Sequence, residues 1–444
     1  MIEINNWRNI LIISKIIEKI MSIIKKDFIK SASIYIISTF INLSTPFFLL
    51  PVLTRYLTTK EYGIVSMINV SVSFLVPFVS LGANSAIQRQ LVDNNDTNKE
   101  YVFNCLMISL LSEVILIIFC FFNKNFLSNV TGIPSVFFYQ IFLIIISTVI
   151  IDISLVILQM KRKEKKYAIF QNLMTVTNFL FSIVMIVNFD MGLKGRVYGI
   201  VCSKVFFSLI GIYIIFKEVG ILCKISKGYL KDSIFNFGIP LIPTSIKSVA
   251  LTYTDRLFIT NMASISETGV YSVGNQFALP ILFLAQAFNL AYVPWLFNKL
   301  KKNIFEDKIK IVRLTYMYFI IIIIIAISWS IIIVPIIKYT SGKEFYGAIS
   351  YVLWLSLGYA FTGMHMMVVN YIYYYKRTKL YSVLTISIIF INAILNYIFI
   401  DKYGAIGAAK ATMLSNFISF LLTWMLVFKI CDMPWLKFLK LNKK

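Results

Sequence analysis

The sequence predicts an all-α integral membrane protein in which about twelve transmembrane helices form two six-helix bundles related as parallel repeats. Of the 444 residues, 59% are hydrophobic and only 14% are charged, a balance that ordinary soluble proteins do not show. Apolar segments long enough to span a bilayer follow one another along the chain. A nine-residue pattern that occurs twice indicates that the two halves are equivalent.

The repeated pattern is E-x-G-x-x-S-x-x-N, which begins at Glu61 and again at Glu267. Each copy follows an apolar segment with two prolines and then an arginine, which is Arg55 in the first half and Arg256 in the second. Parallel repeats of membrane helices around a central site are a transporter architecture. The alternative is that any two helix–loop–helix units of a membrane protein look alike.

About twelve segments account for the apolar sequence. The first half contributes 31–53, 62–88, 101–122, 135–160, 167–187 and 197–216, and the second contributes 234–253, 270–295, 314–337, 348–374, 380–400 and 404–430. The chain therefore divides into an N-terminal amphipathic segment (1–30), a first bundle (31–216), a cytoplasmic linker (217–233), a second bundle (234–430) and a basic cytoplasmic tail (431–444). Met21 would serve as an alternative start, so we expect residues 1–20 to be dispensable.

The positions of lysine and arginine predict the orientation. When the N-terminus is placed inside, most of the 43 basic residues fall in inside segments, so both termini are expected in the cytoplasm. The formal net charge is +23, but the basic residues form small clusters between apolar segments. Nucleic acid is therefore not an expected partner.

The sequence shows no pattern of a catalytic or metal centre. Its five cysteines have neither metal-ligand spacing nor a disulfide framework, and its one histidine, His365, is expected in packing. GxSxG and P-loop motifs are absent from the sequence. We therefore expect no enzymatic activity, no cofactor and no metal ion.

The seventh predicted helix has one polar face. At 100° per residue, this face carries Thr244, Lys247, Ser248, Thr252 and Asp255. Lys247 lies about 20 Å along the helix, well inside the bilayer, where a cation costs on the order of 3 kcal/mol. We expect Lys247 to line a cavity, and the alternative is an ion pair with Asp152 or Asp255.

Helices one, two, seven and eight carry the most polar side chains, in equivalent places in the two halves. Candidate substrate-binding residues there also include Asn42, Asn69, Asn275 and Gln276, because amide groups suit sugar hydroxyls, and ordinary interhelical hydrogen bonds are the alternative. Lys204, about 10 Å in from the outer end of the sixth helix, either reaches a central cavity or snorkels outward. Asp152 would either bind a coupling ion, H⁺ or Na⁺, or neutralise a lysine.

Motifs along nearly the whole chain are similar to those of one known family. They are Pro51, Leu53-Thr54-Arg55, Leu57-Thr58 and Glu61-Tyr62-Gly63; Leu81-Gly82-Ala83 with Arg89; Gly238-Ile239-Pro240-Leu241-Ile242-Pro243 with Asp255-Arg256; Gly269-Val270-Tyr271-Ser272; Asn392 with Asn396; and Tyr403-Gly404-Ala405-Ile406-Gly407-Ala408-Ala409. Together they resemble the polysaccharide (Wzx-like) flippases of the multidrug/oligosaccharidyl-lipid/polysaccharide exporter superfamily.

The resemblance implies that two bundles open alternately to either side of the bacterial inner membrane, in contact with membrane lipids. They would move an undecaprenyl-diphosphate-linked oligosaccharide outward for a surface polysaccharide, such as lipopolysaccharide O-antigen or capsule, in association with polysaccharide polymerase machinery. Lys247, Lys204 and Arg256 would neutralise the diphosphate. Family members often carry more cations in the first half, whereas the first helix here has none.

Other functions remain open at this point. A peptidoglycan-precursor flippase and a cation-coupled small-molecule exporter belong to the same superfamily. An exporter of cations would prefer acidic groups in its cavity. The predicted lysines of the cavity therefore disfavour this function. A membrane glycosyltransferase or polymerase would need carboxylates or a sizeable outer loop, and the sequence shows neither.

Reporter fusions test the predicted orientation. Fusions placed after Lys124, Lys194 and Lys343 should report the outer side of the membrane, because basic loops stay inside. Activity of a cytoplasmic reporter at these positions would overturn the topology.

Replacement of Lys247 tests its predicted role. Lys247→Ala should abolish glycan export at unchanged membrane abundance, and Lys247→Arg should keep part of it because the charge remains. Export by Lys247→Ala at the wild-type level would remove Lys247 from the site. Rescue only by a charge swap with Asp152 or Asp255 would make it a structural ion pair.

Overall fold

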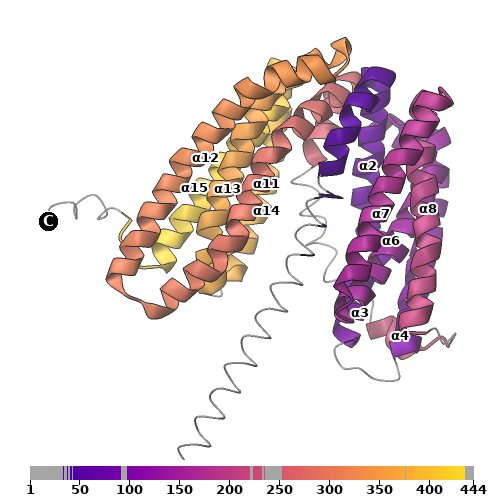
Figure 1. Ribbon diagram of the computed structural model, residues 1–444, viewed down its shortest axis with the longest axis horizontal. Coiled ribbons are helices and arrows are strands. Elements are labelled where there is room, and N and C mark those ends of the chain that lie inside the picture. Colours follow the sequence, from indigo (N-terminus) through magenta and orange to yellow (C-terminus); the bar gives the residue numbers. More distant parts are fainter. Residues whose placement is uncertain are drawn as a thin grey trace, which may run out of the picture.

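The computed structural model describes residues 34, 38, 41–42, 44–91, 98–220, 224–232, 235, 253–375 and 377–435, and its helices form two bundles (Figure 1). Within this described part no residue lies in a strand, and ten helices are long and apolar enough to cross a membrane. The predicted all-α, multi-span membrane fold is thus confirmed. Segment 1–30, including Met21, lies outside the described residues, as does most of the tail, and the domain boundaries stay predictions.

Ten of the described helices coincide with predicted segments, whereas of the predicted span 234–253 only residues 235 and 253 are described. The first bundle contains helix 44–56, α2 (Thr59–Ser80), α3 (Ala83–Gln90), α4 (Asn98–Phe122), α5 (Lys124–Thr131), α6 (Phe138–Met160), α7 (Glu164–Ile183) and α8 (Gly192–Glu218). After the short α9 (Lys227–Asp232), the second contains helix 253–262, α11 (Ile265–Lys302), α12 (Phe305–Thr340), α13 (Ile349–Tyr374), α14 (Thr378–Tyr403) and α15 (Ile406–Ile430).

The predicted second span, 62–88, is wrong as a single helix. Leu81 and Gly82 both take the left-handed conformation, with φ of 41° and 67°, and this ends α2 and starts α3. Glycine adopts the left-handed conformation without strain, and the residue before it, Leu81, adopts the same conformation at this break. The break was missed because the apolar character of the sequence continues across it.

The glutamate of each repeated motif lies in the first turn of a helix, Glu61 in α2 and Glu267 in α11. Thr58 accepts a hydrogen bond from the backbone N–H of Glu61, and the Glu61 carboxylate accepts one from the N–H of Thr58, which together make a capping box. In the second copy Ser264 accepts from the N–H of Glu267 at 3.1 Å. The Glu267 carboxylate accepts instead from the Tyr351 hydroxyl at 2.7 Å, so this glutamate also fastens α11 to α13.

The two copies of the motif pack directly against each other. A Cβ atom added to Gly63 would lie 2.0 Å from the carbonyl oxygen of Ile265, and one added to Gly269 would lie 2.1 Å from that of Thr59. One turn after each of these glycines, the Ser66 hydroxyl of α2 and the Ser272 hydroxyl of α11 share a hydrogen bond of 2.7 Å. Equivalent residues therefore face equivalent residues, as they do at a two-fold interface.

A second pair of equivalent contacts lies near this contact between α2 and α11, which we call the closure. The Arg55 guanidinium donates to the carbonyl of Tyr339 at 3.1 Å, and the Asn261 amide donates to the carbonyl of Val130 at 2.9 Å. The offset that relates the two motifs also relates Arg55 to Asn261. Arg55 and Arg256, the arginines that precede the two motifs, therefore do not stand at the same distance from them. Both contacts lie where the bundles meet, and the bundles diverge toward the opposite end (Figure 1).

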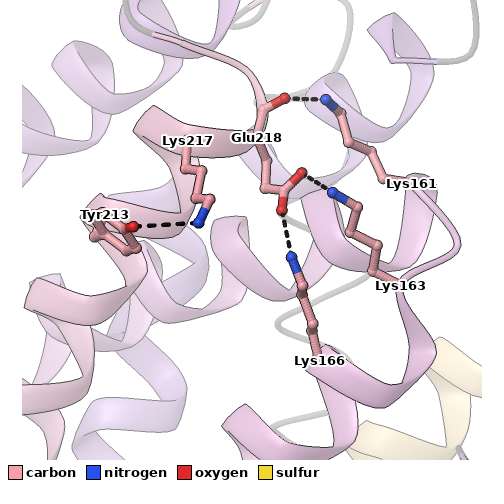
Figure 2. Close-up of polar contacts among 6 residues, drawn as sticks. All are labelled: Lys161, Lys163, Lys166, Tyr213, Lys217 and Glu218. Carbon is pink, nitrogen blue, oxygen red and sulfur yellow. Dashed lines mark hydrogen bonds and ion pairs between the residues drawn. The ribbon is translucent and has the colours of Figure 1, made fainter.

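At the diverging end, lysines fasten the turn between α6 and α7 to the end of α8 (Figure 2). The Glu218 carboxylate accepts from Lys163 and, at 3.2 Å, from Lys166, while Lys161 donates to the Glu218 carbonyl. An acidic residue at a helix C-terminus opposes the helix dipole, so the lysines offset that effect. This basic loop is therefore partly neutralised within the first bundle.

The reciprocal glycines make the closure testable. Gly63→Ala should separate α2 from α11, because its Cβ would overlap the carbonyl of Ile265. In a Ser66→Cys/Ser272→Cys background, we expect Gly63→Ala to reduce spontaneous disulfide formation by more than half. Gly228→Ala is the matched control, since its Cβ would meet nothing nearer than 3.7 Å. An undiminished disulfide yield in Gly63→Ala would contradict the packing described.

Candidate functional site

A cavity of about 840 Å³ lies between the two bundles. Its walls come from helix 44–56, α2, α6, α7 and α8 on one side and from α11, α13, α14 and α15 on the other, with helix 253–262 at the seam. The paired motifs border it, since Ser66 and Ser272 belong to its lining. Both halves therefore contribute to one site, as the internal repeat predicts.

Positive charge dominates the lining of this cavity. Arg196 and Lys204 of α8 and Arg256 of helix 253–262 line it, whereas Asp255 is the one carboxylate among the described lining residues. Low-dielectric walls of one sign of charge attract ligands of the opposite sign. The described wall is therefore suited to an anion.

Arg196 is held at the closed end of the cavity. One of its terminal nitrogens donates to Asn178 at 2.9 Å and to Ser182 at 2.5 Å, while its Nε has no partner among the described residues. Tyr62 lies near both Arg196 of the first bundle and Arg256 of the second. Two guanidinium groups that line one cavity can bind an anion through several charge-assisted hydrogen bonds.

Arg256 connects the cavity to the closure between the halves. Its Nε donates to the Ser272 hydroxyl at 3.1 Å, the same hydroxyl that pairs with Ser66. The guanidinium carbon lies 5.1 Å from the centroid of the Tyr253 ring, within cation–π range. Arg256 is 8% exposed, so these contacts fix its position.

Asp255 holds four helices of the second bundle together. Its carboxylate accepts hydrogen bonds from Tyr271 of α11 at 2.7 Å, from Asn396 of α14 at 2.8 Å, and from Thr412 of α15. A carboxylate that accepts three hydrogen bonds while buried serves as a structural hub. This arrangement keeps the adjacent Arg256 aimed at the seam.

The structure brings some predicted site residues together and leaves others apart. Asn69, Lys204, Asn275 and Gln276 line the cavity, and the Asn275 amide oxygen accepts from Tyr359 at 2.6 Å. Asn42 is absent from the described lining, and its amide instead donates to Asn172 of α7 at 2.8 Å, which is the interhelical alternative.

Two further predictions stand differently. Asp152 of α6 interacts electrostatically with Lys204 and is absent from the described lining. Thr244, Lys247 and Ser248 lie outside the described residues, so their expected roles stay predictions.

Sequence reasoning missed two parts of the wall. Arg196 precedes the sixth predicted span, 197–216, and so was expected in an outer loop. The structure places it in α8, where it lines the cavity. His365 was expected in packing, but it lines the cavity together with Tyr359 and Tyr381. Tyr359, Thr362 and His365 follow one another at intervals of three residues, and this spacing could have shown that they share one face of a helix.

Comparisons with known proteins agree with this architecture. The family model described as polysaccharide biosynthesis protein matches residues 28–299, so the chain belongs to that family. Lsg locus putative protein 1 of Haemophilus influenzae is 26% identical over 85% of this chain and 94% of its own length. An uncharacterized membrane protein of the same organism is 28% identical over 84% of this chain and 91% of its own length.

Solved structures show the same fold. The lipid II flippase MurJ in an inward closed conformation superposes with a TM-score of 0.74 at 17% identity, covering 93% of this chain and 89% of that one. An inward-facing multidrug resistance MATE family transporter of the MOP superfamily gives 0.71 at 15% identity, covering 91% and 96%. The expected superfamily fold is confirmed.

Proposed function

We propose that this protein moves an undecaprenyl-diphosphate-linked oligosaccharide across the bacterial inner membrane by alternating access, as a step in surface polysaccharide synthesis. The observation that carries the proposal is the cation-rich cavity between two equivalent halves, which are closed against each other at one end. Membership in a polysaccharide biosynthesis family supports this class of substrate.

The cations of the cavity match the charge of a diphosphate. Arg196, Lys204 and Arg256 would donate charge-assisted hydrogen bonds to its oxygens, and Lys247 would add a fourth cation from the seventh helix. The polyprenyl tail would stay among membrane lipids, because the outer faces of the bundles are apolar. This division keeps the charged group out of the hydrocarbon during transport.

The diverging end of the bundles would face the cytoplasm. It carries Lys163 and Lys166 of the first bundle and Lys299, Lys301 and Lys302 at the end of α11. Basic residues stay on the cytoplasmic side of membrane proteins. In this orientation the structure would receive substrate from the side on which it is made, and the protein would associate with polysaccharide polymerase machinery that uses the exported product.

A coupling ion would act through Asp152. Because Asp152 interacts with Lys204, binding of H⁺ or Na⁺ there would change how strongly the neighbouring cation attracts the diphosphate. Ion binding would thereby be linked to substrate affinity.

The charge of the cavity also ranks the alternatives. Among the described lining residues, three cations against one carboxylate disfavour an exporter of cationic small molecules. A peptidoglycan-precursor flippase would use the same cations, since that lipid also carries a diphosphate. Comparison of the two lipid-linked substrates in one assay decides between them.

Transport by the purified protein in vesicles tests the proposal. Arg196→Gln and Lys204→Gln should each slow translocation of undecaprenyl-diphosphate-linked oligosaccharide at least about tenfold, the loss expected for one hydrogen bond to a charged group. Lys194→Gln is the matched control, because Lys194 is an exposed cation of the same helix and should stay within about twofold of wild type. No translocation by the wild-type protein, or unchanged rates in both cavity variants, would refute the proposal.

A further inference from the structure

The cavity wall formed by α13, α14 and α15 differs chemically from the wall formed by α8. Within the described chain, no Lys, Arg, Asp or Glu side chain of these three helices lines the cavity. Their lining side chains are instead aromatic, hydroxyl and amide groups, chiefly Tyr359, Thr362, His365, Tyr381, Thr385 and Asn416. The cavity thus has a cationic side and an uncharged, hydrogen-bonding side.

Two rings on the uncharged side lie nearly parallel. The centroids of His365 of α13 and Tyr381 of α14 are 5.8 Å apart with an interplanar angle of 29°, and the Tyr381 hydroxyl lies 3.3 Å from Nε2 of His365. Both side chains are half-buried and both line the cavity. Paired rings that are rigid and partly exposed offer a flat apolar surface to a ligand.

The ring pair lies farther from the closure than Arg256 does. Tyr359 lines the cavity with Arg256 and donates to Asn275 of α11, and His365 follows six residues later on α13, about 9 Å toward the diverging end. Tyr381 belongs to the first turn of α14, which starts at that same end. If the charged group of a ligand bound Arg256, the adjoining part of the ligand would therefore lie along Thr362 and His365.

We propose that the wall of α13, α14 and α15 is a sugar subsite, with the His365–Tyr381 pair as the platform on which a sugar ring packs. The inference rests on the proposed function and assigns the two parts of its substrate to two sides of the cavity. The C–H face of a sugar ring is apolar and packs on aromatic rings, while its hydroxyls can donate to the side-chain oxygens of Thr362, Thr385 and Asn416, whose own donors bind backbone carbonyls. The diphosphate lies with Arg196 and Arg256, and the glycan extends toward the diverging end.

A structural role for the ring pair leads to a different expectation. If His365 and Tyr381 only joined α13 to α14, their loss would weaken the second bundle as a whole. Every ligand of the cavity would then lose affinity by a similar factor. A sugar platform, in contrast, affects only ligands that carry a sugar.

Binding of two lipids by the full-length protein in lipid nanodiscs separates these outcomes. The probes are undecaprenyl diphosphate, which has no sugar, and the lipid-linked oligosaccharide extracted from cells that lack this protein. Tyr381→Ala and His365→Ala should each weaken binding of the oligosaccharide lipid about fivefold to tenfold and leave undecaprenyl diphosphate within about twofold. Tyr381→Phe keeps the ring and should keep most of the affinity. Arg196→Gln should weaken both probes alike.

Tyr397→Ala is the matched control, since Tyr397 lies on α14 and is 62% exposed outside the described lining. A thermal unfolding midpoint measured for each variant shows whether it is folded. If Tyr381→Ala and His365→Ala lost affinity equally for both probes, or for neither, the sugar subsite would be overturned. The proposed function would still stand as long as the wild-type protein bound both probes. Failure of the wild-type protein to bind undecaprenyl diphosphate would overturn the proposed function itself.

Discussion

The close approach of α2 and α11 is the constraint on which the rest of the structure depends. Gly63 and Gly269 leave no room for a Cβ, so the two backbones touch and the hydroxyls of Ser66 and Ser272 come within hydrogen-bond distance. Such a bond between neutral groups contributes about 1 kcal/mol. A closure built on backbone contact and a weak neutral bond holds the halves in one register without a large electrostatic barrier to their separation.

Arg256 links this closure to the charge of the cavity. It donates to Ser272, lies over the ring of Tyr253, and is oriented by the neighbouring Asp255, whose carboxylate is bonded to three other helices. A guanidinium group at this place touches both the cavity and the contact between the halves. Through the Ser272 hydroxyl, which also pairs with Ser66, this one side chain connects the lining of the cavity to the contact between the halves.

The two ends of the molecule use polar groups in different ways. At the closed end, Thr58 and Ser264 cap helices, and Arg55 and Asn261 bind carbonyl groups of the opposite half. At the diverging end, the α6–α7 lysines pair with Glu218 within one bundle. Among the described residues, the hydrogen bonds between the halves thus lie at the end where the repeated motifs meet.

Length and hydropathy along the chain predicted the described membrane spans apart from the break at Leu81 and Gly82, and the repeated motif predicted that α2 and α11 occupy corresponding places. Asn69, Lys204 and Gln276 were also predicted as wall residues. These features can be read from the sequence because each depends on the identity and spacing of residues along the chain. The tertiary structure alone decided that Arg196 enters the cavity, that Asn42 binds α7, that Arg55 and Asn261 each bind the opposite half, and that His365 meets Tyr381. Each of these depends on the rotation of one helix against another, and that rotation is set by the packing of the whole bundle.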